Sequence, residues 1–250
     1  MDIGKSFTFM FDDEKWVEKV VIGALLVLAS IIPLVNLFTG LVLVGYSLRL
    51  LKNVAEGSET PLPEWDDWGG DWLKGLMTLL AWVIYSIPIW LVSGAGALVE
   101  ALAQTEEVMA VCGVAVSCLS GLWGLAMAVV LPAGIIQYAM DGEFKDFFQL
   151  GKMFKFIGDN LSNYLIAVLL SIVASIVASF GVIACVIGVF ATQFWGNLVT
   201  AHLFGQVKAE AVGVTVSAAP VEATVSTYGE LTDSDLDVEI SPDPHDRPEE

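Results

Sequence analysis

The chain is poor in charged residues, and this shortage decides its broad class. Only 16% of its 250 residues are charged and 56% are hydrophobic, whereas an ordinary soluble domain carries roughly 25% charged residues. The excess apolar side chains cannot all fit into one small core. They gather in four stretches, at about 17–51, 72–99, 108–140 and 161–205, each longer than the ~18 apolar residues that mark a bilayer span. The sequence therefore predicts an all-α, polytopic helical membrane protein.

Basic residues are especially scarce. The chain has 11 Lys and Arg against 29 Asp and Glu, which gives a formal net charge of -18. The excess of acid is shared between residues 1–206 and residues 207–250. Neither part offers the basic patch that phosphate contacts require, so nucleic acid is excluded as a partner.

Cysteine and histidine are also few. Cys112, Cys118 and Cys185 all lie inside apolar stretches, without a CxxC pair and without a neighbouring histidine. We interpret them as small buried hydrophobic residues and expect no metal site and no cofactor.

Ionisable side chains are missing from the middle of the predicted spans. Glu100, Asp141 and Asp159 fall at predicted helix ends. Because intramembrane charges mark most proton relays and ion paths, this pattern argues against a proton-coupled pump and against an intramembrane hydrolase. The sequence offers no catalytic residues, and we expect a protein that is not an enzyme.

The number of spans depends on the first apolar stretch. As one helix, residues 17–51 would measure ~52 Å at 1.5 Å per residue, against a hydrocarbon core of ~30 Å. Pro33 is expected to divide this stretch into two helices. Six spans result, at about 17–33, 35–51, 73–93, 113–139, 161–179 and 182–204.

The placement of basic residues favours this count over five spans. Lys and Arg accumulate in cytoplasmic loops, and five spans would divide ten of them three against seven. Six spans place all ten on one side: Lys5, Lys15, Lys19, Arg49, Lys52, Lys74, Lys145, Lys152, Lys155 and Lys208. We therefore expect a cell-membrane protein with both termini in the cytoplasm.

Three further segments complete the predicted organisation. Residues 1–16 carry no signal peptide pattern and are expected to form a cytoplasmic or interfacial N-terminal segment ahead of the six-span domain at 17–206. Residues 144–158 have phenylalanines at helical spacing opposite lysines, which predicts an amphipathic helix lying in the membrane interface. Residues 207–250 are predicted to form a disordered acidic cytoplasmic tail, because they have too little apolar area to offset the entropy of ordering.

The most distinctive motif immediately precedes the third predicted span. It consists of Trp65, Asp66, Asp67, Trp68, Gly69, Gly70, Asp71 and Trp72, after the Pro61-Leu62-Pro63-Glu64 segment. The tryptophans have the spacing i, i+3 and i+7 of one helical face and are interpreted as interfacial anchors. The acids are better explained by capping of a helix N-terminus than by binding of a divalent cation.

These residues also carry a resemblance. The Gly45-Tyr46-Ser47-Leu48-Arg49 end of span two, the tryptophan and acid motif, Gln137-Tyr138-Ala139, residues 160–164 and residues 201–206 resemble the membrane protein family catalogued as domain of unknown function 4013. The resemblance covers about residues 8–207. It implies a multi-span fold and a prokaryotic origin, and it supplies no catalytic or ligand residues.

Spans five and six carry small residues four apart. These are Ala167, Ser171, Ser175 and Ser179 on one helix and Gly188, Thr192, Gly196 and Thr200 on the other. Small residues permit the close packing that joins helices in a bilayer. We expect the two stripes to meet across a hairpin, so that leucine at Ser175 destabilises the protein.

Two functions lead, and an intramembrane enzyme is the least favoured third. The leading interpretation is a non-enzymatic accessory, scaffold or envelope-associated component of the lipid bilayer, which meets protein partners through its cytoplasmic helix and tail. The alternative is a small-solute or ion transporter or channel, in which backbone at proline and glycine breaks would hold the substrate.

Overall fold

The computed structural model describes residues 1–103, 105–184 and 188–214, and every element in these ranges is helical. These residues belong to one unit of the chain. The elements are α1 Ile3–Thr8, η1 Phe9–Asp12, α2 Trp16–Ala29, α3 Pro33–Ala55, α4 Trp68–Leu102, α5 Glu106–Asp141, η2 Phe144–Phe148, α6 Leu150–Asp159, α7 Leu161–Ser179, α8 Gly181–Ala184 and α9 Gly188–Ala211.

Four of the described helices, α3, α4, α5 and α7, are long and apolar enough to cross a membrane. The all-helical membrane class is thus confirmed, but the count of six spans is not. Helix α2 has 14 residues, or about 21 Å, and is shorter than the hydrocarbon core. Helix α9 has 24 residues but carries Gln193, Asn197 and His202 along its length.

Local sequence rules account for most helix boundaries. Helix α2 ends at Ala29 and α3 begins with Pro33 at its first turn, where the missing N–H of proline costs nothing. Thr105 caps α5 through a hydrogen bond from Val108 N, and α5 ends at Gly142, whose φ of 76° is the left-handed conformation that glycine favours. Pro88 and Pro132 lie inside α4 and α5 without ending them.

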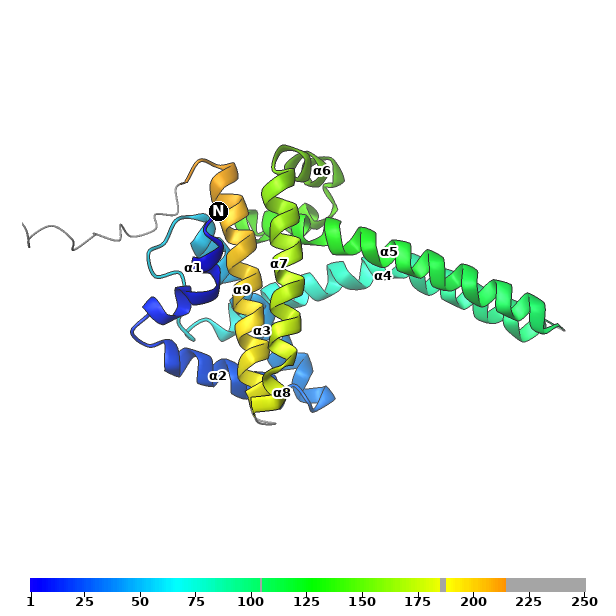
Figure 1. The fold of residues 1–250 in the computed structure, drawn as a ribbon, viewed down its shortest axis with the longest axis horizontal. Helices are drawn as coiled ribbons and strands as arrows, with labels where there is room; N and C mark the ends of the chain where they lie inside the picture. The colour runs from blue at the N-terminus through cyan, green and yellow to red at the C-terminus, as the bar shows by residue number, and fades with distance from the viewer. Residues whose placement is uncertain (104, 185–187, 215–250) are drawn as a thin grey trace, which may run out of the picture. The chain divides into compact units, whose positions relative to one another are not determined.

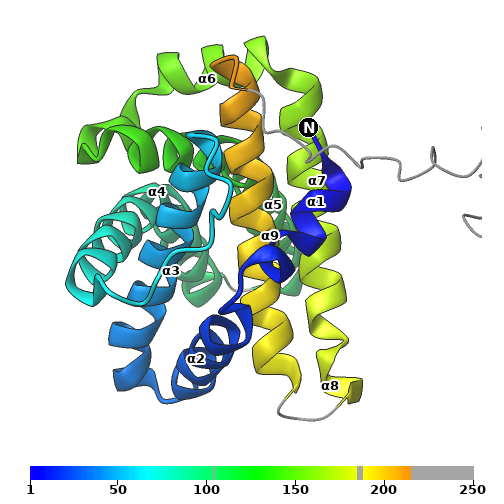
Figure 2. The ribbon, with the colours of Figure 1, turned by 90° about the vertical axis from the view of Figure 1, so that its left-hand side faces the viewer.

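Helices α3, α7 and α9 run side by side, and α2 packs against α3 and α9 (Figures 1 and 2). The core between them is built from large side chains that are fully buried, including Tyr46, Leu50, Tyr164, Phe194 and Leu198. Helix α4 crosses α3 steeply (Figure 2). A β-carbon at Gly45 would lie 2.0 Å from the Asp71 carbonyl oxygen, so glycine is required for this crossing.

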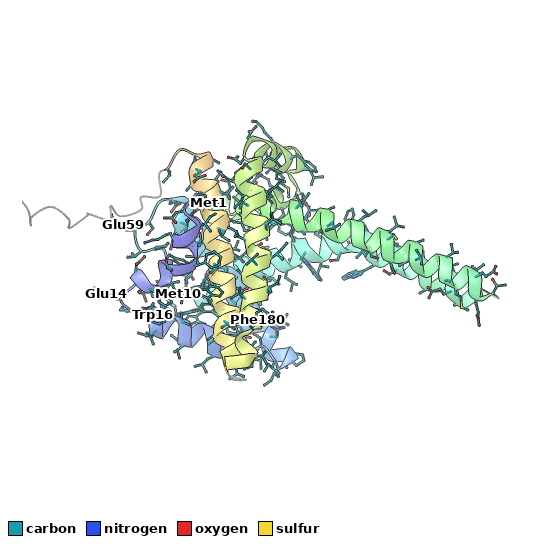
Figure 3. The ribbon with its side chains drawn as sticks, viewed as in Figure 1. Met1, Met10, Glu14, Trp16, Glu59 and Phe180 are labelled. Carbon is teal, nitrogen blue, oxygen red and sulfur yellow. The ribbon has the colours of Figure 1, made fainter. Side chains whose placement is uncertain are left out.

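Helices α4 and α5 form an antiparallel hairpin whose side chains point outward over much of its length (Figure 3). Leu91 is 68% exposed and Leu125 67%. Large apolar side chains exposed in this way form a surface that a soluble protein would have to cover, and they fit helices that are long and apolar enough to cross a membrane.

The predicted amphipathic helix at 144–158 differs from expectation. It is divided into η2 and α6. Phe147, Met153 and Ile157 are buried, since η2 and α6 pack against α5. The apolar face therefore covers protein, and only the side with Leu150 and Phe154 is exposed.

Helix α9 continues to Ala211, so residues 207–211 belong to the helix. The remainder of the predicted tail lies outside the described residues from 215 onward, and its disorder stays a prediction.

Candidate functional site

The Pro61–Glu64 segment lies against α2 and α3 instead of extending away from them. Each of its four carbonyls accepts one hydrogen bond from a helix side chain: Pro61 O from Asn53 (2.9 Å), Leu62 O from Lys19 (3.0 Å), Pro63 O from Tyr46 (2.8 Å) and Glu64 O from Arg49 (2.8 Å). We call this segment and these side chains, together with Asp13, Trp65, Asp66 and Asp71, the charged junction.

The spacing of residues along α3 explains why the segment fits there. Tyr46, Arg49 and Asn53 stand at i, i+3 and i+7, which places them on one face of the helix. Pro61 and Pro63 have no N–H and favour an extended chain, whose carbonyls need external donors. The helix face supplies those donors in register with the segment.

Arg49 joins the motif to α3. Its Nε and Nη2 donate to both oxygens of Asp71 at 2.8 and 2.7 Å, and its Nη1 donates to Asp66 at 2.8 Å. The Asp71 side chain is fully buried, whereas the Asp66 side chain is 70% exposed. The hydrogen bond from Arg49 lowers the pKa of Asp66. A paired geometry of this kind suits guanidinium and is not reproduced by lysine.

Lys19 joins the motif to α2 and the N-terminal segment. Its side chain is 4% exposed, and its Nζ lies 2.7 Å from Asp13 and 3.0 Å from Glu64. Asp13 also accepts a hydrogen bond from Lys15 N at the start of α2. A buried cation is tolerated because carboxylates and a carbonyl surround it.

The three tryptophans of the motif do not share a helical face, in contrast to the prediction. Trp65 precedes α4 and stacks on Tyr46 with ring centroids 4.0 Å apart, and it donates to Lys19 O at 3.1 Å. Trp68 donates to Trp65 O and Trp72 donates to Leu37 O. Trp65 is therefore half-buried and packs against the protein core.

The acidic side chains of the motif bind other groups of the protein. Asp67 caps α4 by accepting from Gly70 N at 2.9 Å, as the capping interpretation expects, while Asp66 and Asp71 bind Arg49. Gly69 is at the first turn of α4 and meets no atom that would exclude a β-carbon. In the part of the chain that the structure describes, no three His, Cys, Asp or Glu side chains are grouped to hold a metal ion.

A second feature is a cavity of about 620 Å³ between α2, α3, α4, α5, α7 and α9. Its lining is mainly apolar, with Leu43, Leu48, Ile135 and Phe204 among the residues. Polar side chains also reach it: Ser30, Asn36, Ser47, Thr78, Ser171, Gln193, Asn197 and Thr200. Its size and lining are typical of a site for a small ligand.

The small residues that join α7 to α9 differ partly from those predicted. On α9, Thr192 donates to Ala178 O at 2.7 Å, and a β-carbon at Gly196 would lie 3.1 Å from Ala178 Cβ. On α7, however, the buried small residues are Ala167, Ala174 and Ala178. Ser171 is half-buried at the cavity and Ser175 and Ser179 are exposed. Gly188 begins α9.

The N-terminal segment docks on the end of α9. Asp2 exchanges two hydrogen bonds with the Gln206 side chain, at 2.8 and 3.0 Å, and the His202 Nδ1 lies 3.0 Å from Ser6 Oγ. Phe9 stacks on the His202 ring. Sequence reasoning predicted none of these contacts, and none of those made by Lys19, Tyr46, Arg49 and Asn53. The i, i+3, i+7 spacing on α3 was the available signal for the last three.

Residues 25–187 match the family model described as Protein of unknown function (DUF4013). The match includes α3, the Pro61–Trp72 motif, α4, α5 and α7, but not the N-terminal segment or residues 201–206. Among curated proteins and among solved structures, no match was found.

Proposed function

Because the chain belongs to the DUF4013 family, whose description names no activity, we propose a function from its geometry. The protein is a six-span component of the cell membrane that is not an enzyme and acts as an accessory or scaffold subunit. Both of its termini lie in the cytoplasm.

The pairing of α7 with α9 supports a fifth crossing. Near one end, Asn163 of α7 donates to Glu210 of α9, and near the other, Thr192 of α9 donates to Ala178 of α7. The two helices thus run antiparallel over the same depth. If α7 crosses the bilayer, α9 returns across it.

The contact between the N-terminal segment and α9 supports an even number of crossings. Asp2 and Ser6 bind Gln206 and His202, so residues 2–6 and 202–206 lie on the same side of the membrane. Helix α2 then supplies the sixth crossing, with the bilayer thinned or flanking residues reaching the interface. Helix α4 crosses α3 steeply (Figure 2). For all six helices to cross one bilayer, the α4–α5 hairpin therefore has to tilt toward α7 and α9.

The charged junction is the main observation that supports a scaffold function. Lys19 pairs with Asp13 and Arg49 pairs with Asp71, and each of the two cations also donates to a carbonyl of the Pro61–Glu64 segment. Such an arrangement holds the loop against two helices and engages these charges within the protein. The exposed side of α6, with Leu150, Phe154 and Lys155, is the surface that we assign to partners, together with the tail.

The experiment has two arms. Purified protein in liposomes should pass no more solute or ion than empty liposomes do. In cells, a photoreactive residue at Phe154 should give a discrete adduct with one other protein, whereas the same residue at Leu91 on the lipid-facing hairpin should not. Flux above the empty control, or equal adducts at both positions, would contradict the scaffold assignment.

A small-solute transporter is the second candidate, because the cavity between the helices brings polar side chains to the interior of the bundle. Pro132 lies in its wall, where helix-breaking residues of transporters are often found. Saturable flux that falls when the cavity residue Thr78 is replaced by leucine would favour this candidate.

A further inference from the structure

The cavity between the helices is lined by polar side chains that are not needed to pack the bundle. Five of its polar side chains are hydroxyls, at Ser30, Ser47, Thr78, Ser171 and Thr200, and each donates to a carbonyl of its own helix at 2.7 to 3.0 Å. Ser and Thr satisfy themselves in membrane helices in this way. Their hydroxyl hydrogens are therefore already used in hydrogen bonds, although their oxygens can still accept a hydrogen bond.

The three amides of the cavity behave differently. Within the described residues, the side chains of Asn36, Gln193 and Asn197 have no hydrogen-bond partner, and all three line the cavity. Gln193 is half-buried and Asn36 and Asn197 are exposed, and an amide without a partner is costly wherever the bilayer keeps water away. Each side-chain amide offers both hydrogen-bond donors and an acceptor. The site therefore suits a molecule that can both accept and donate hydrogen bonds.

The lining also limits the charge of that occupant. Among the residues that the structure describes, no Lys, Arg, Asp or Glu lines the cavity. An ion held there would lack the paired charge that burial requires. A neutral molecule meets no such penalty.

The distribution of polar and apolar groups indicates the shape of the occupant. From Asn36 to Leu51, the wall formed by α3 extends about 22 Å along the helix axis at 1.5 Å per residue. Asn36 stands near the start of α3, whereas Leu48, Leu51 and Phe204 line the cavity toward the far ends of α3 and α9. Asn36 and Asn197 are exposed, so a molecule can enter from beside the helices.

From these observations we propose that the cavity binds a neutral membrane amphiphile, with an uncharged hydrogen-bonding head at Asn36, Gln193 and Asn197 and an apolar chain along α3 and α9. The site is independent of whether the protein transports anything. A scaffold can hold such a molecule as well as a transporter can.

The test uses the full chain in nanodiscs and a diacylglycerol with a photoreactive acyl chain. Crosslinks mapped by mass spectrometry should concentrate on α3 and α9 residues of the cavity. Unlabelled diacylglycerol should compete, whereas phosphatidate with the same acyl chains should not, because only its head is charged.

Variants give a second measurement. Asn197→Leu and Gln193→Leu should each lower cavity labelling about fivefold, since one hydrogen bond contributes ~1 kcal/mol. Ser175→Leu, an exposed change outside the cavity, should leave labelling unchanged. Labelling spread over the lipid-facing surface of α4 and α5, or equal competition by phosphatidate, would overturn the proposal. The crosslink map and the lipid competition are both measured on the wild-type protein, so they test the proposal even if a leucine variant fails to fold.

Discussion

Asp71 and Asp66 bind the same guanidinium but differ in burial, and this pair provides a sharp test of the charged junction. The Asp71 side chain is fully buried and receives two hydrogen bonds from Arg49, whereas the Asp66 side chain is 70% exposed and receives one. Replacing either by asparagine keeps the shape and removes the charge. The two substitutions therefore compare a buried and an exposed ion pair in one site.

We expect Asp71→Asn to be strongly destabilising. Breaking a buried ion pair typically costs 3–5 kcal/mol, because the remaining charge loses its partner. Arg49 is still 17% exposed and keeps Asp66 and Glu64 O, so we expect the lower end, about 3 kcal/mol. At about 2–4 °C per kcal/mol for a chain of this size, the melting temperature should fall by at least about 6 °C.

Asp66→Asn is the matched control and should change the melting temperature little, because water screens exposed pairs. The assay is thermal unfolding of the detergent-solubilised protein, followed by tryptophan fluorescence and by retention of the monodisperse peak on gel filtration. Equal effects of the two variants, or an Asp71→Asn protein as stable as the wild type, would refute the assignment of Arg49 and Asp71 as the buried pair of this junction.

Three further predictions follow from other contacts. Gly196→Leu should destabilise the protein by about 1–3 kcal/mol through overpacking against Ala178, whereas Ser175→Leu should be tolerated because Ser175 is exposed; the reverse order in thermal unfolding would show that the serine stripe is the interface. Tyr46→Phe should cost about 1–3 kcal/mol by leaving Pro63 O without its donor, and an unchanged melting temperature would argue against a stabilising role for the hydrogen bond between Tyr46 and Pro63 O. Deleting residues 215–250 should leave insertion and melting temperature nearly unchanged, and a large fall would show that the tail docks.

Local chemistry made several features predictable from the sequence. Pro33 lies in the first turn of α3, the helix position that proline favours, and α7 spans the residues expected of the fifth span. The cap by Asp67 also follows from residues within one turn. Each of these depends on neighbours in the sequence alone.

Tertiary contacts could not be predicted in the same way. On α7, the predicted stripe at 167, 171, 175 and 179 and the buried stripe at 167, 174 and 178 share Ala167 and then diverge, and both are small enough for close packing. Residue size does not distinguish the two stripes, so the sequence predicted Ala167 correctly but named Ser175 and Ser179 where the structure buries Ala174 and Ala178. The donors for the Pro61–Glu64 carbonyls lie 8 to 43 residues away in sequence, and the fold-back that brings them together has no local signal.

The six-span topology is tested most directly at the two ends of the membrane domain. Single cysteines at Glu14 (labelled in Figure 3) and Val212, both exposed, are introduced into a chain without native cysteines and labelled from outside with a membrane-impermeant maleimide. Ser58 and Thr105 serve as references for the cytoplasmic and the external side. Six spans require Glu14 and Val212 to be protected together with Ser58, while Thr105 reacts. Reaction of Glu14 and Val212 together with Thr105 would mean that only α3, α4, α5 and α7 cross the membrane and would contradict the proposed topology.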